Sequence, residues 1–156
     1  MKVPLKIERS LEVPAPYKKA QSLLADLETT IKRFPKLKRL KKLGDNDYVW
    51  ELETIGSRIA NIAHDVSYGA RYSVNTARGE LSWKPLPKQG NASIEGAFKL
   101  TEMAGRTRLS FRVQGELHDV PVPLMYRLAA PAFIQGKFTR LVDTFLERTR
   151  DALATH

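Results

Sequence analysis

Three polar side chains, Arg9, His64 and Tyr68, fall in segments that read as β-strands and carry the groups best suited to chemistry. A guanidinium can neutralise an acidic group, and an imidazole can accept or donate a proton near neutral pH. A phenol can hold a substrate by a hydrogen bond. Scattered over strands, such groups would work mainly by orienting a reactive substrate.

Arg9 continues the alternation of apolar residues in the first predicted strand, Val3 to Val13, and so falls on its inward face. An unpaired guanidinium is costly to bury, so an inward Arg9 needs an acidic partner. That partner could be the acidic head group of a ligand. It could equally be a strand carboxylate such as Glu51 or Glu53, and a bulge could also turn Arg9 outward.

His64 and Asp65 cannot form a His–Asp pair, because neighbouring residues in a strand point to opposite faces. His64 is therefore either a ligand contact or proton-transfer group, or a histidine satisfied in the core or at the surface. The three histidines, including His118 and His156, lack the spacing of metal ligands, and the chain has no cysteine. No nucleophile elbow, glycine-rich phosphate loop or HExxH motif is present, so we assign no catalytic residue, metal or cofactor.

A dense group of cations follows the first predicted helix. Its members, which we call the basic cluster, are Lys32, Arg33, Lys36, Lys38, Arg39, Lys41 and Lys42. The basic cluster could hold the protein at an anionic membrane, with about 1 kcal/mol from each cation near the surface. Nucleic acid is not an expected partner, because no recognised binding motif accompanies the cations. A solvated charged face is the usual explanation for such a run.

The chain has 156 residues, a formal net charge of +9 and 42% hydrophobic residues. This length suits one core, so we expect a single domain over residues 1–156. The first residues are charged and lack the apolar run of a secretory signal. The longest apolar run, Leu128 to Ile134, is far shorter than the ~20 residues that cross a bilayer. We therefore expect a cytoplasmic protein.

Hydrophobic periodicity predicts the elements that would position these side chains. After the first strand, apolar spacings of three and four indicate a helix from Pro16 to Phe34, with an interruption around residues 26–28. Period-two segments between turn signals then indicate about six strands. The last two, residues 92–101 and 107–117, form a predicted hairpin.

The C-terminal segment reads as one long amphipathic helix from Leu124 to Ala154. Pro131 and Gly136 both weaken a helix, so we expect a kink near them. The first half of the helix, up to Phe133, could then tilt on its own. It would act as a gate for any cavity under the helix.

Four stretches of the chain together resemble a known superfamily. They are Val13-Pro14-Ala15-Pro16, Ala20 with Leu23-Leu24-Ala25-Asp26-Leu27-Glu28, Phe34-Pro35, and Phe138, Leu141 and Phe145 in the closing helix. They resemble the START-like, or helix-grip, superfamily, which includes polyketide cyclases, lipid-transfer domains and coenzyme-Q-binding proteins. The resemblance implies an α+β fold: a curved antiparallel sheet of about seven strands around a long C-terminal helix, with one or two short helices after the first strand. It also implies an apolar ligand cavity and no shared catalytic residues.

We therefore expect the protein to bind or transport a hydrophobic small molecule, such as a lipid, quinone or polyketide. The expected ligand contacts are Arg9, Trp50, His64, Tyr68, Trp83, Phe98, Phe111, Met125, Leu128 and Phe138. The same residues could instead fill a packed core, because periodicity does not distinguish a hollow interior from a filled one. Two other functions stay open: a cyclase- or dehydratase-type enzyme using Arg9, His64 or Tyr68, and an interaction module whose basic cluster binds nucleic acid or an anionic membrane.

Overall fold

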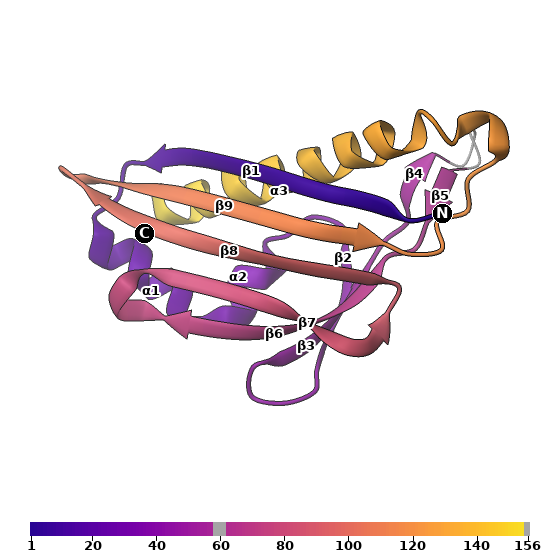
Figure 1. The fold of residues 1–156 in the computed structure, drawn as a ribbon. Helices are drawn as coiled ribbons and strands as arrows, with labels where there is room; N and C mark the ends of the chain where they lie inside the picture. The colour runs from indigo at the N-terminus through magenta and orange to yellow at the C-terminus, as the bar shows by residue number, and fades with distance from the viewer. Residues whose placement is uncertain (58–61, 155–156) are drawn as a thin grey trace.

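The computed structural model describes residues 1–57 and 62–154 of the chain. Its main element is a seven-stranded antiparallel sheet with the order β1-β9-β8-β7-β6-β3-β2 (Figure 1). In chain order its strands are β1 (Val3–Val13), β2 (Leu37–Lys42), β3 (Asp47–Leu52), β6 (Ser67–Asn75), β7 (Glu80–Gly90), β8 (Ala92–Met103) and β9 (Arg106–Leu117). A smaller sheet pairs β4 (Ile55–Ser57) with β5 (Ile62–His64). The last strand, β9, thus lies beside the first strand, β1.

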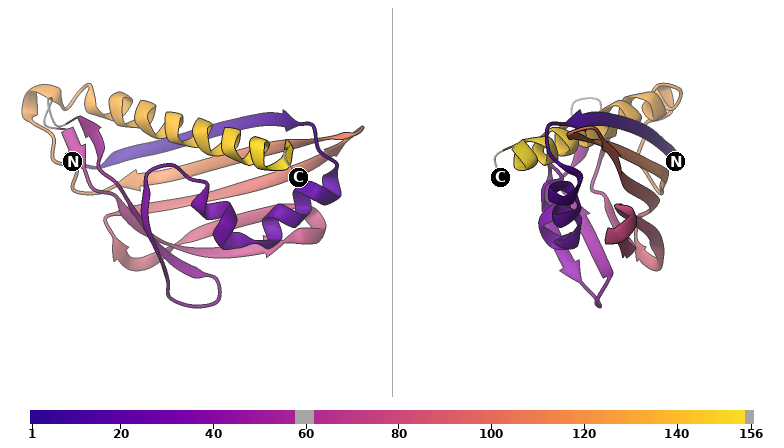
Figure 2. Two further views of the ribbon diagram at one scale, coloured as in Figure 1. Left: turned by 180° about the vertical axis from the view of Figure 1, so that it is seen from behind. Right: turned by 90° about the vertical axis from the view of Figure 1, so that its left-hand side faces the viewer.

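The helices lie on the concave side of the sheet (Figure 2). They are α1 (Tyr17–Ala25), α2 (Leu27–Lys32) and α3 (Ala130–Ala154), with short 3₁₀ turns η1 (Thr76–Arg78) and η2 (Leu124–Tyr126). α3 runs roughly 37 Å at 1.5 Å per residue and crosses the sheet, while α1 and α2 cover another part of the same side. The predicted α+β helix-grip architecture is confirmed. None of the helices in the described ranges is long and apolar enough to cross a membrane.

The predicted interruption of the first helix lies at Asp26. Its carboxylate accepts hydrogen bonds from the Thr29 hydroxyl at 2.7 Å and from the Thr29 backbone N–H at 3.2 Å. These bonds lower the pKa of Asp26 and cap the N-terminus of α2. The Thr30 hydroxyl then donates to the Leu23 carbonyl at 2.7 Å, which ties α2 to α1. α2 is thereby held with Ile31 buried on the concave side.

The C-terminal helix is shorter than predicted. α3 begins at Ala130, and residues 124–126 form the separate turn η2. Pro131 therefore lies in the first turn of α3, where its missing N–H costs no intrahelical hydrogen bond. α3 then continues through Gly136 as one element. The predicted kink between two helical halves is wrong, because the proline starts the helix.

Strand β7 continues past Pro85 and Pro87 to Gly90. Its pairing with β8 stops at Trp83, opposite Gly96, while its pairing with β6 continues through Pro85. Beyond Trp83 one side of β7 therefore needs no ladder donors, and prolines are tolerated there. The hairpin predicted at residues 92–101 and 107–117 is confirmed as β8 and β9, each slightly longer than expected.

Candidate ligand-binding site

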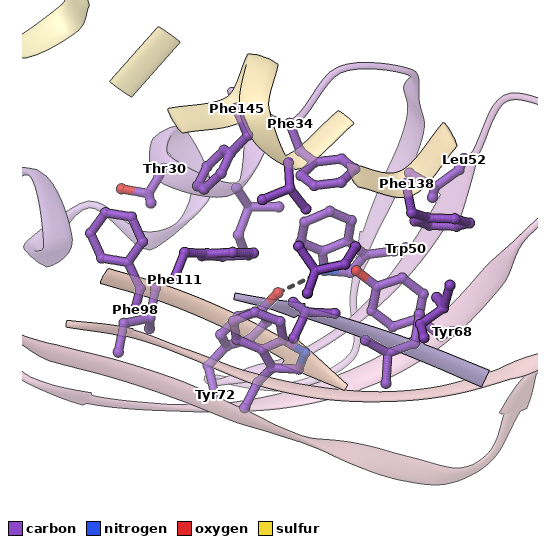
Figure 3. Close-up of a pocket in the computed structure, with 18 residues that line it drawn as sticks. Thr30, Phe34, Trp50, Leu52, Tyr68, Tyr72, Phe98, Phe111, Phe138 and Phe145 are labelled. Atoms are coloured by element: carbon purple, nitrogen blue, oxygen red, sulfur yellow. Dashed lines mark hydrogen bonds between the residues drawn. The ribbon is translucent and has the colours of Figure 1, made fainter. Parts of the chain in front are cut away.

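A small apolar cavity lies between the concave face of the sheet and helices α2 and α3 (Figure 3). Its volume is about 40 Å³. Six strands, β1, β3, β6, β7, β8 and β9, line it together with α2, the residue Phe34 after α2, and the middle of α3. No charged side chain among the described residues lines this cavity.

Six aromatic side chains around the cavity form a closed circuit of contacts, which we call the aromatic circuit. In order they are Phe34, Trp50, Tyr72, Trp83, Phe111 and Phe145. Five of its contacts join ring centroids 5.4 to 5.9 Å apart. The sixth is a 2.8 Å hydrogen bond from Trp50 Nε1 to the Tyr72 hydroxyl. Because aromatic pairs contribute about 0.5–1.5 kcal/mol each beyond their burial, the circuit holds its members firmly in place.

Polar atoms are few in the cavity wall. The indole nitrogen Nε1 of Trp83 is buried and has no hydrogen-bond partner within residues 1–57 and 62–154. Leaving a buried donor unpaired costs about 1–3 kcal/mol, so an acceptor that reached this N–H would gain a hydrogen bond. Burial raises the pKa of the Tyr68 and Tyr72 phenols, so both hydroxyls stay protonated near neutral pH.

The cavity is far smaller than an ordinary ligand pocket, which has a volume of about 300–1,000 Å³. At ~10–15 Å³ for each water, 40 Å³ has room for roughly three water molecules. The aromatic side chains fill most of the interior. Of the two interiors that the sequence allowed, a packed core and a hollow ligand cavity, the structure is closer to the packed core. A larger ligand can enter only if some of these side chains, or the helices above them, move.

Six of the ten predicted ligand contacts lie together in the cavity wall. They are Trp50, Tyr68, Trp83, Phe98, Phe111 and Phe138, and all six are buried. The strands place the first five at inward-facing positions, and α3 places Phe138 on its apolar face. The other four, Arg9, His64, Met125 and Leu128, lie outside this wall.

Arg9 lies on β1 and pairs with α3. Its Nε donates to Asp143 Oδ1 at 3.0 Å, and its Nη1 donates to the Glu8 carbonyl at 3.1 Å. The side chain is 45% exposed. Because β1 is an edge strand, this position lies at the rim between sheet and helix. The expected acidic partner exists, but it is a helix carboxylate and not the strand carboxylate that the sequence suggested.

His64 ends β5, opposite Ile55 of β4, in the smaller sheet. Burial is the main cause that lowers the pKa of His64, and the nearby charges of Asp65 and Asp119 oppose it. Its Nε2 is buried and finds no hydrogen-bond partner in the described part of the chain. The ring therefore stays neutral near pH 7 and lies away from the cavity.

Met125 and Leu128 lie at the surface, the first 79% exposed and the second fully exposed. We predicted that they lie over the cavity, in a helix that begins at Leu124. Since α3 starts only at Ala130, they belong instead to the connection between β9 and α3. The structure does not bring them to the cavity.

The basic cluster spans the end of α2, the turn after it and strand β2. Lys38, Arg39, Lys41 and Lys42 of β2 are exposed. Within the described chain, β2 pairs only with β3, so its outer edge is open. Charged side chains on an open edge hinder pairing with other chains. This role explains the cations of β2 without the need for a membrane or nucleic-acid partner.

Three aromatic wall residues, Phe34, Tyr72 and Phe145, were not among the predicted ligand contacts. Tyr72 lies four residues after the predicted Tyr68, on the same face of β6. Phe145 lies seven residues after Phe138, on the same face of α3. Both could have been found by extending the periodicity. Phe34 follows α2, but it continues the apolar spacing of three and four through Leu27 and Ile31, so the same reasoning could have found it.

Metal-ligating side chains do not gather in groups of three or more anywhere in residues 1–57 and 62–154. His118 Nε2 lies 3.2 Å from Glu116 Oε1 at a partly buried position. His156, the third histidine considered, lies outside the described residues. The described part of the chain thus offers no arrangement that would hold a metal cofactor.

No family model and no curated protein matches this sequence. Solved structures match its fold over nearly the whole chain. The Zhui aromatase/cyclase from Streptomyces sp. R1128 is 15% identical with a TM-score of 0.71, and the match covers 97% of this chain and 94% of that one. A START superfamily protein from Mycobacterium smegmatis is 12% identical with a TM-score of 0.67, over 96% and 97% of the two chains.

A further solved structure, Ara h 8.0201, is 11% identical with a TM-score of 0.62, over 98% of this chain and 99% of that one. These structures establish that the chain has the START-like, or helix-grip, fold that the resemblance implied. Identities this low establish the fold alone. The function must therefore be argued from the site.

Proposed function

We propose that the protein binds a hydrophobic small molecule between its sheet and α3, and that it carries or senses this molecule in the cytoplasm. The observation that carries the proposal is the aromatic-walled cavity with the unpaired N–H of Trp83. Apolar walls with a few polar groups suit such a ligand, because burial supplies most of its affinity and polar contacts set its orientation. The likeness in fold to an aromatase/cyclase and a START superfamily protein supports this class of ligand.

The wall favours a flat, conjugated and neutral ligand. Flat rings can stack on or meet edge-on the side chains of the aromatic circuit. The Trp83 N–H would donate to an acceptor such as a carbonyl oxygen. No cation of the described chain lines the cavity to balance an anionic ligand. A quinone or an aromatic polyketide has these properties, whereas a saturated lipid lacks the conjugated ring.

Ligand entry requires the interior to open, because only about 40 Å³ is free. α2 is the wall element best suited to move. It has six residues, and helices that short depend on their packing for stability. Thr30 and Ile31 of α2 line the cavity, so displacing α2 would enlarge it. Hydrogen exchange tests this step: α2 amides should exchange faster than those of β8 and β9 in the free protein, and a bound ligand should slow them.

Native mass spectrometry of the protein purified from its own cells, followed by organic extraction, tests the proposal directly. We expect a stoichiometric, neutral, conjugated molecule in the extract. The released ligand, added back to the stripped protein, then gives an affinity. A protein that carries nothing and binds none of a panel of quinones and aromatic polyketides would count against the proposal.

Trp83→Phe tests the role of the indole N–H, because it removes the donor and keeps an aromatic ring. Loss of one hydrogen bond should weaken ligand binding about tenfold. Trp50→Phe is the matched control, because the Trp50 N–H is already bonded to Tyr72 within the protein. Equal effects of the two substitutions on affinity would mean that the ligand accepts no hydrogen bond from Trp83.

A cyclase- or dehydratase-type enzyme acting in the same cavity is the second candidate, favoured by the likeness to an aromatase/cyclase. Of the three polar residues considered for it, only Tyr68 lies in the wall. Because burial raises the pKa of Tyr68, its phenol would orient a substrate by donating a hydrogen bond and would not act as a base. Turnover of the extracted molecule that Tyr68→Phe abolishes and Arg9→Ala leaves intact would favour the enzyme.

Contact of the basic cluster with an anionic membrane stays a prediction. It is supported by the exposure of Lys38, Lys41 and Lys42 on β2. Lys38→Glu with Lys41→Glu should then lower binding to anionic vesicles. Unchanged vesicle binding would leave edge protection as the role of these cations.

A further inference from the structure

The connection between β9 and α3, together with the first turn of α3, carries most of the large apolar side chains that the described chain exposes. Of eight such residues, five lie within residues 124–133. They are Leu124, Met125, Tyr126, Leu128 and Phe133, and we call them the apolar tip. The segment protrudes at the end of the molecule where β4 and β5 lie (Figure 1). Contiguous exposed apolar side chains mark an interaction site, whereas single ones need no explanation.

The backbone of this segment is ordered by its own hydrogen bonds. The N–H of Tyr126 donates to the Pro123 carbonyl at 2.9 Å, and the N–H of Ala129 donates to the Tyr126 carbonyl at 3.1 Å. These bonds form the turn η2 and lead into α3 without burying the side chains. The apolar tip is therefore held outward by a defined turn.

The segment that carries the apolar tip is rich in cations. From Val120 to Val142 the sequence contains three cations, Arg127, Lys137 and Arg140, and no carboxylate, although Asp119 comes directly before this stretch. The ammonium of Lys137 lies 5.3 Å from the centre of the Phe133 ring, so cation and aromatic ring share one surface. The next carboxylate along the chain, Asp143, is paired with Arg9.

We propose that the apolar tip inserts into the interface of an anionic lipid bilayer. Apolar side chains enter the boundary between head groups and acyl chains, while cations beside them attract anionic lipids. A stable protein partner would need about 20–30 residues on each side, whereas the apolar tip offers five side chains at one end of the molecule. This inference goes beyond the proposed function and holds whether or not the cavity takes a ligand.

The apolar tip is separate from the basic cluster. Arg148 Nη1 donates to the Arg33 carbonyl at 3.3 Å, so the start of the basic cluster lies beside the last turns of α3. Eighteen residues separate Ala130 from Arg148 along that helix, roughly 27 Å at 1.5 Å per residue. Membrane binding through the apolar tip and membrane binding through the basic cluster should therefore be weakened by substitutions at different residues.

Co-sedimentation with vesicles tests the proposal. The full chain should bind vesicles of equal parts phosphatidylcholine and phosphatidylglycerol, and bind pure phosphatidylcholine less tightly. The triple variant Leu124→Ser, Met125→Ser, Leu128→Ser should bind the anionic vesicles at least about tenfold less, because three exposed apolar side chains no longer insert. The matched control is Leu43→Ser with Val74→Ser, two other exposed apolar residues, which should bind as the unaltered protein does.

Several outcomes would overturn the proposal. One is failure of the unaltered protein to bind anionic vesicles, and another is full binding by the triple variant. A third is sensitivity to Lys38→Glu with Lys41→Glu but not to the triple variant, which would assign the contact to the basic cluster. Sedimentation velocity without lipid adds a fourth: a dimer that the triple variant dissociates would make the apolar tip an interface between copies.

Fluorescence gives an independent reading. Both native tryptophans, Trp50 and Trp83, are buried, so a tryptophan introduced by Leu128→Trp would report on the apolar tip alone. Its emission should shift to shorter wavelength when anionic vesicles are added, and brominated lipids should quench it. An unchanged emission with protein bound to the vesicles would mean that the protein binds through another surface, which overturns the proposal.

Discussion

The indole ring of Trp83 packs directly over Gly96, its cross-strand partner on β8. A Cβ atom at Gly96 would meet the six-membered part of that ring and would lie 2.6 Å from the Arg112 carbonyl oxygen. The glycine therefore leaves the space in which Trp83 lies flat against the sheet. From there its ring reaches Tyr72 and Phe111, at centroid distances of 5.8 and 5.9 Å.

Gly96→Ala should destabilise the protein by about 1–3 kcal/mol, because the added methyl forces the Trp83 ring or the sheet backbone to move. Urea denaturation followed by tryptophan fluorescence measures this. Gly136→Ala is the control, because a Cβ at Gly136 in α3 meets nothing within 4 Å. It should stabilise the protein by up to about 1 kcal/mol. Equal stability of the two variants would refute the packing argument.

Tyr72→Phe should cost about 1–3 kcal/mol of unfolding free energy, because it leaves the buried Trp50 N–H without its acceptor. The double variant Trp50→Phe, Tyr72→Phe removes donor and acceptor together. If the hydrogen bond matters, the double variant should lose less stability than the sum of the two single variants. Strict additivity in chemical denaturation would mean that the bond adds nothing to the aromatic circuit.

Strand alternation predicted the cavity wall well where the strands are regular and central. Trp50, Trp83 and Phe111 all occupy inward positions that period two identifies. Arg9 obeys the same alternation, yet it lies on an edge strand where α3 supplies Asp143 at the rim. Which residue of a distant helix meets an edge strand depends on how the helix crosses the sheet, and local sequence does not contain that angle.

Pro131 shows a second limit. A proline can interrupt a helix or occupy its first turn, and the periodicity on both sides is compatible with either. In the structure Pro131 lies in the first turn of α3, so Met125 and Leu128 lie at the surface before the helix and not in the predicted gate. The free volume of the interior is a third limit, because the same aromatic residues can line a wide pocket or fill most of it.

His64 should make stability depend on pH. Burial lowers the pKa of His64 in the folded protein below its ordinary value of 6.5. As the pH falls through about 6.5, the unfolded chain takes up a proton before the folded one does, so the free energy of unfolding decreases. The contribution is complete above that pH and is lost as the pH falls through the folded-state pKa. Urea midpoints measured between about pH 8 and pH 5 would follow it.

His64→Gln removes the titrating group and should flatten that pH profile. His118→Gln is the control, because this histidine lies at a partly buried position beside Glu116 and not in β5. The control variant should keep the decline of stability toward low pH. A profile that His64→Gln leaves unchanged would show that another group causes the decline.

The cations on β2 should protect the open edge of the sheet. β2 pairs on one side with β3, and no other described strand pairs with its outer side. Lys38→Val with Lys41→Val would leave an edge strand with higher β-propensity and two fewer charges, so it should aggregate faster on mild heating, as measured by light scattering. Lys99→Val with Arg112→Val removes the same charge from exposed positions of β8 and β9, where both residues have paired strands on either side. If the lost net charge causes aggregation, both variants should aggregate at the same rate. If the open edge causes it, the β2 variant should aggregate faster than the control, because the backbone groups on the outer side of β2 can pair with another chain.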